Sequence, residues 1–86
     1  MPFTVPSWFK QRQGKAEPAG DNVYRLTGPN LGEAFIGIRK GPNNLWAGYQ
    51  AASATGPDLE ATEPRYEIDA DAWNAIFELY RRRVIV

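Results

Sequence analysis

The sequence predicts an α+β fold: a three- to four-stranded antiparallel β-meander packed on one C-terminal α-helix, with an extended N-terminal arm. Between residues 23 and 68, apolar and polar residues alternate with a period of two, as in strands that bury one face. Turn motifs interrupt this alternation at short intervals. After residue 68 the apolar residues recur with a helical period.

The length of 86 residues predicts one small domain, 1–86, with no room for a second core. We expect residues 1–21 to form an arm and a connecting loop, and residues 22–86 to form the sheet and the helix. A chain of this size buries only about 60% of its unfolded surface, so its stability margin is small. Apolar residues at 43% suffice for a packed core.

Three turn motifs separate the predicted strands: Gly28-Pro29-Asn30, Gly41-Pro42-Asn43 and Gly56-Pro57-Asp58. Proline presets φ for the first corner of a turn, and Asn or Asp tolerates the left-handed conformation that often follows. The alternating segments between these turns predict strands over residues 23–27, 33–39, 45–51 and 65–68. The second and third of these are expected to pair as a hairpin through residues 40–44.

The predicted helix begins at Asp69, a favourable N-cap, with Ile68 and Trp73 spaced for a hydrophobic staple. Trp73, Ile76, Phe77 and Tyr80 form one apolar stripe. This stripe is expected to pack on the sheet face that carries Ile36, Ile38 and Ile68. The β-branched residues 84–86 are expected to leave the helix, as an edge strand or as a tail across the core.

A single helix leaves the second sheet face to be explained. We expect this face to carry Val23, Phe35 and Trp46 beside Arg25, Arg39 and Arg65. The first nine residues hold Phe3, Val5, Trp8 and Phe9, and their prolines prevent a long helix or a central strand. This arm either folds back over the second sheet face or docks on another chain. The polar stretch 11–22 is read as the connecting loop.

The sequence contains few of the side chains that catalysis and metal binding usually require. It contains no histidine and no cysteine, and Ser7 and Ser53 therefore have no imidazole to activate them. Asp69 and Asp71 are better explained as helix-capping charges than as a cation site. The acidic residues Asp58, Glu60, Glu63 and Glu67 lack the spacing of a calcium loop. We therefore expect a protein that is not an enzyme, with no cofactor and no metal.

The charges balance overall but are unevenly placed. Ten cations match ten anions, so no net field attracts nucleic acid or an anionic membrane. Residues 1–50 carry an excess of three cations, residues 51–79 an excess of six anions, and Arg81–Arg83 restore neutrality. No signal peptide and no stretch of about 20 apolar residues is found, so a cytoplasmic location is the default expectation.

Three short motifs resemble those of AP2 and phage-integrase arm domains: Gly37-Ile38-Arg39, Leu45-Trp46-Ala47-Gly48-Tyr49 and Ala70-Asp71-Ala72-Trp73. The resemblance covers roughly residues 34–80. It implies a three-stranded sheet that enters the major groove of DNA, with Arg39 and Trp46 touching the DNA. The family's reading surface is basic, whereas Asp58, Glu60 and Glu63 precede the last predicted strand here, and the loop 52–64 is longer than the pattern requires.

The sequence favours a small non-catalytic protein-interaction or accessory module that binds a protein partner or a second copy of itself. Aromatic and arginine side chains on an uncovered face are typical of interaction hot spots. The residues expected to make contact are Trp8, Phe35, Arg39 and Trp46. The alternative is a nucleic-acid-binding domain that would use Arg25, Arg39, Trp46 and Arg65. Neutral net charge argues against it, because phosphate contacts supply most of the affinity of such domains.

Overall fold

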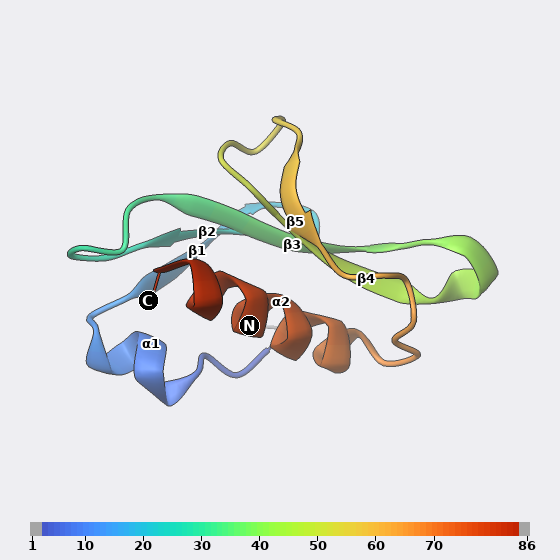
Figure 1. Ribbon diagram of the computed structural model, residues 1–86, viewed down its shortest axis with the longest axis horizontal. Helices are drawn as coiled ribbons and strands as arrows, with labels where there is room; N and C mark the ends of the chain where they lie inside the picture. Colours follow the sequence, from blue (N-terminus) through green and yellow to red (C-terminus); the bar gives the residue numbers. More distant parts are fainter. Residues whose placement is uncertain (1–2, 85–86) are drawn as a thin grey trace.

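The structure, a computed structural model, describes residues 3–84 and shows an α+β fold with two layers (Figure 1). One layer is an antiparallel sheet of five strands in chain order. Both helices lie on the same side of this sheet (Figure 1). No helix within residues 3–84 is long and apolar enough to cross a bilayer. The elements are α1 (Ser7–Gln11), β1 (Lys15–Gly20), β2 (Val23–Thr27), β3 (Ala34–Lys40), the short 3-10 helix η1 (Pro42–Asn44), β4 (Trp46–Ala51), β5 (Asp58–Ala61) and α2 (Asp69–Val84).

The three central strands confirm the predicted meander. β2 pairs with β3, and β3 pairs with β4 so that Ile38 stands opposite Gly48. The turn between β3 and β4 contains η1, where Asn43 and Asn44 adopt left-handed backbone angles with φ near 60°. Asparagine tolerates this conformation better than most residues do. The turn closes with a 2.8 Å hydrogen bond from the Gly41 N–H to the Leu45 carbonyl.

The two edges of the sheet differ from the prediction. Residues 15–20, expected to belong to a loop, form β1, and residues 58–61, expected between strands, form β5 with a bulge against β4. The predicted strand over 65–68 is wrong, because only Tyr66 forms an isolated bridge with Trp46. The side chain of Ile68, expected to face the core, is 60% exposed. The meander therefore has five strands rather than three or four.

Helix α2 packs its predicted apolar stripe against the sheet. Trp73, Ile76, Phe77 and Tyr80 are all buried, facing core residues of β2 and β3. The helix approaches β4 closely at Gly48, where an added Cβ would lie 2.7 Å from the Ile76 Cβ and 2.9 Å from the Ala72 carbonyl oxygen. A side chain at this position would therefore push α2 away from the sheet.

The two ends of α2 test the predicted N-cap, the hydrophobic staple and the C-terminal tail. The helix begins at Asp69, whose Oδ1 accepts a 2.8 Å hydrogen bond from the Ala70 N–H. The predicted hydrophobic staple is not supported, because exposed Ile68 does not join the core beside Trp73. Three arginines occupy the last turn, where cations favour the helix dipole. Val84 is still helical, and the remaining two residues of the predicted tail lie outside the described part of the chain.

The N-terminal arm, residues 3–14, folds back on its own chain. It lies beside α2 on the helix side of the sheet (Figure 1), so the expectation that it would cover the second sheet face is wrong. The Phe3 ring centroid lies 4.6 Å from that of Trp73 and 4.9 Å from that of Tyr24. The Phe9 ring lies 5.9 Å from Phe77. The arm thus completes the helix-side core and leaves the opposite sheet face free of it.

Candidate functional site on the outer sheet face

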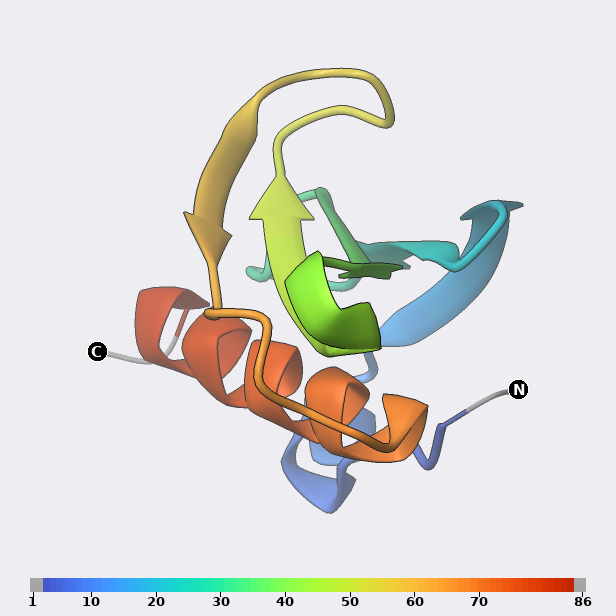
Figure 2. The same ribbon diagram turned by 90° about the vertical axis from the view of Figure 1, so that its right-hand side faces the viewer.

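The sheet face that points away from α2 is called the outer face here. Within residues 3–84 no helix covers it, because α1, α2 and the arm all lie on the other side (Figure 1). The loop between β4 and β5 arches away from the helices and rises over this side of the sheet (Figure 2). Alternation along the paired central strands assigns to the outer face Val23, Arg25, Thr27, Phe35, Gly37, Arg39, Ala47, Tyr49 and Ala51.

Tyr49 lies at the centre of the outer face. It stands opposite Gly37 in the register, and an added Cβ at Gly37 would lie 2.5 Å from the Tyr49 hydroxyl oxygen. The missing side chain of Gly37 therefore makes room for the tyrosine to lie across β3. The guanidinium carbon of Arg39 lies 4.4 Å from the centroid of the Tyr49 ring, within the range of a cation–π contact.

Asp58 of β5 completes this group by accepting a hydrogen bond from Arg39 Nη2. The side chain of Arg39 remains 53% exposed. Arginine carries five N–H donors, and Asp58 is its one hydrogen-bond acceptor among residues 3–84. The guanidinium is therefore held in position on both sides while most of its donors stay available.

Burial raises the pKa of the Tyr49 hydroxyl above its ordinary value. The positive charge of Arg39 opposes this change in pKa, and the negative charge of Asp58 adds to it. The hydroxyl consequently stays protonated at neutral pH. Tyr49 can then donate as well as accept a hydrogen bond at the surface.

A second ion pair lies further along the same face. Arg25 Nε donates a 2.6 Å hydrogen bond to Glu33 Oε2, and Arg25 stands opposite Phe35 in the register. β1 adds one charge of each sign, because Lys15 and Glu17 pair with outer-face residues of β2. Three cations and three anions therefore share this face, and both arginines are paired with carboxylates.

The structure brings together two of the four residues predicted to contact a partner. Phe35 and Arg39 share the outer face, whereas Trp8 packs against Tyr80 on the helix side. The placement of Trp46 on the outer face is wrong. Trp46 pairs with Lys40 and packs against the helix-side core, because it stands two residues from Gly48, which contacts α2.

Arg65 is also not on the outer face, so only Arg25 and Arg39 remain there from the alternative nucleic-acid set. The guanidinium of Arg65 lies 5.4 Å from the Tyr66 ring centroid and donates to the Tyr66 hydroxyl at 3.3 Å. It borders a groove of about 380 Å³ between residues 61–66 and α2. This groove also holds Glu63, Glu78 and Arg82, so its charges balance.

Tyr49 is the outer-face residue that was not singled out from the sequence. A cross-strand count from the turn Pro42–Asn44 would have placed it opposite Gly37, a glycine in the middle of a strand. Such a glycine signals the close approach of another group.

Within residues 3–84 no cluster of three metal-ligating side chains is formed. The outer face combines the rings of Phe35 and Tyr49 with the guanidinium of Arg39. Comparison with protein-family models, with curated proteins and with solved structures finds no match for this chain.

Proposed function

We propose that this chain is a small protein-binding module whose contact surface is the outer face, with Phe35, Arg39 and Tyr49 as the anchors. The observation that carries the proposal is the fixed position of Arg39 between the Tyr49 ring and Asp58 on a face that no described helix covers. Aromatic and arginine side chains dominate binding energy in protein interfaces. A side chain that is already ordered loses less conformational entropy when a partner binds.

The charges of the outer face favour a protein over nucleic acid as the partner. Arg25 and Arg39 are already neutralised by Glu33 and Asp58. Binding to a phosphate backbone gains its affinity from cations that displace counterions. A face with equal numbers of cations and anions has little to gain in this way.

The same chemistry defines the partner. The half-buried rings of Phe35 and Tyr49 suit an apolar side chain, and the free donors of Arg39 suit a carboxylate or a backbone carbonyl. The partner segment is therefore one that places an acidic residue beside an aromatic or aliphatic residue. Contact with the ring of Tyr49 then adds to the apolar area that binding removes from water.

A displayed library of random peptides tests this proposal. The library is selected on the wild-type protein and then depleted on the Arg39→Ala variant. We expect the surviving peptides to combine an acidic residue with an apolar one and to bind Arg39→Ala at least tenfold more weakly. Arg82→Ala, an exposed arginine of α2, is the matched control and should bind these peptides like the wild type.

Peptides that bind Arg39→Ala and the wild type equally would contradict the proposal. Titration of a labelled DNA duplex at low and high salt decides the nucleic-acid alternative. Binding that falls steeply with salt and disappears in Arg39→Ala would assign the outer face to nucleic acid instead.

A further inference from the structure

We propose that the N-terminal arm, residues 3–14, is exchangeable between copies of this chain, so that the groove it occupies also accepts the arm of a second copy. The result is an arm-exchanged dimer in which each core is completed by the partner's Phe3, Trp8 and Phe9. This inference concerns the helix side of the molecule and does not depend on the outer face.

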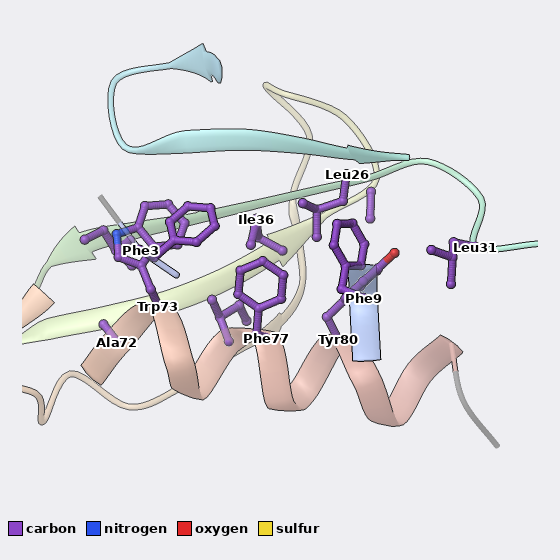
Figure 3. Close-up of a cluster of buried hydrophobic side chains, with 12 residues drawn as sticks. Phe3, Phe9, Leu26, Leu31, Ile36, Ala72, Trp73, Phe77 and Tyr80 are labelled. Atoms are coloured by element: carbon purple, nitrogen blue, oxygen red, sulfur yellow. The ribbon is translucent and has the colours of Figure 1, made fainter. Parts of the chain in front are cut away.

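The arm supplies a large part of the core. Phe9 is fully buried, and its ring lies 5.9 Å from Phe77 and 6.1 Å from Tyr80. Phe3 lies at the other end of α2 beside Trp73 (Figure 3), and its ring also contacts that of Tyr24. A body without an arm would expose these aromatic side chains of α2 and β2. Covering these aromatic side chains with an arm is therefore strongly favourable, whichever copy supplies the arm.

Among residues 3–84, no main-chain hydrogen bond attaches the arm to the body. Within residues 3–84, the backbone hydrogen bonds of residues 6–14 all connect residues of the arm with one another, such as Lys10 N–H to Pro6 and Gly14 N–H to Phe9. The arm also forms no salt bridge in this range. Among the described residues, side-chain burial is what holds it in place, so the arm can leave as a unit without breaking the sheet.

The contact between the arm and α2 is imperfect. Trp73 Nε1 and Tyr80 Oη are buried without a hydrogen-bond partner among the described residues, and both side chains contact arm residues. Pro6 and Trp8 of the arm and neighbouring side chains of α2 line a depression of about 210 Å³. Unpaired buried polar groups reduce the net gain from docking the arm, which makes its release easier.

The hinge, residues 12–14, connects the arm to β1 and is short and strained. Only Arg12, Gln13 and Gly14 separate α1 from β1, and Gln13 has a φ of 60°. A residue other than glycine pays a conformational cost in this left-handed region. Short strained hinges favour exchange, because opening the hinge relieves the strain while the contacts of the exchanged element are kept.

A second copy is the occupant that fits the groove, because its arm makes the same contacts that the chain makes with itself. The intramolecular arrangement wins at low protein concentration, since the tethered arm has an effective concentration on the order of 1 mM. Exchange should therefore appear near that concentration, or when the hinge can no longer reverse the chain.

Two hinge variants test this inference by light scattering. Deletion of Arg12 and Gln13, both exposed, prevents the arm from reaching its own groove and should give a particle of about twice the monomer mass of 9.6 kDa. Insertion of four glycines after Gln13 lengthens the hinge and should give a monomer. A folded, monomeric deletion variant would overturn the proposal. Arg39→Ala in the deletion variant should leave the dimer intact, and its loss would assign the dimer to the outer face.

A measurement on the wild-type chain decides the matter if the deletion variant does not fold. Isotope-labelled and unlabelled chains are unfolded, mixed and refolded together at about 1 mM. Isotope-filtered nuclear Overhauser spectra should then show contacts between Phe9 of one copy and Phe77 or Tyr80 of another. Absence of these intermolecular contacts at this concentration would overturn arm exchange.

Discussion

The close crossing of α2 over β4 at Gly48 predicts that Gly48→Ala destabilises the fold. The new Cβ would lie 2.7 Å from the Ile76 Cβ, whereas carbon atoms pack best at about 3.5–4.0 Å. The overlap of roughly 1 Å is relieved only if the helix moves, and overpacking of this kind costs about 1–3 kcal/mol. Alanine in a strand returns about 0.5–1 kcal/mol relative to glycine. The net loss should be about 1–2 kcal/mol.

Gly56→Ala is the matched control for this prediction. Its Cβ would lie 2.5 Å from Ser53 Oγ, a similarly short distance, but the obstacle is the end of an exposed side chain. Ser53 can change its rotamer, so we expect a loss below about 1 kcal/mol. Urea denaturation of both variants measures the difference, with unchanged m-values. The melting temperature of Gly48→Ala should fall by roughly 4–15 °C. Equal losses in the two variants would refute the argument that a helix backbone sets the cost.

Three further outcomes are expected. Phe9→Ala should lose about 3–5 kcal/mol in thermal or urea unfolding, because Phe9 is fully buried, whereas exposed Lys10→Ala should change stability by less than about 0.5 kcal/mol. Burial raises the pKa of Tyr80, so Tyr80 ionises at lower pH in the unfolded chain, and the free energy of unfolding should fall as pH rises above about 10. Tyr80→Phe should reduce this fall and should not lose stability at pH 7. Some of the fall should persist in this variant, because the pKa of Tyr49 is also raised. Arg39→Ala should lose less than about 1 kcal/mol in the same unfolding assay, because its ion pair with Asp58 is half exposed, and a larger loss would show that Arg39 is structural.

The central strands and α2 could be predicted because their side chains decide where they lie. Strands β2 and β3 alternate between residues that face α2 and residues that face outward, and α2 carries its apolar stripe. The two edge strands lacked such a signal. β1 is almost entirely exposed and contains Pro18, and β5 is acidic, so neither buries a row of side chains. Backbone hydrogen bonding to a neighbouring strand holds them, and that depends little on sequence.

The candidate site was half predictable for a related reason. Phe35 and Arg39 lie two pleats apart on one strand, so their common face follows from alternation alone. Whether Trp46 joins them depends on the register of the next strand, and a shift of one residue moves every side chain to the other face. The turn at Pro42–Asn44 sets that register by pairing Lys40 with Trp46. The contribution of Asp58 depends on β5, which the sequence pattern did not reveal.

The two sheet edges have a consequence for how this chain behaves when it is concentrated. Pro18 offers no N–H group to an incoming strand, and β1 places the charges of Lys15 and Glu17 beside it. At the opposite edge β5 is only four residues long, interrupted by a bulge, and carries Asp58 and Glu60. Neither border is a good template for adding strands from other molecules. Growth into fibrils through edge-to-edge pairing is therefore opposed at both ends of the sheet.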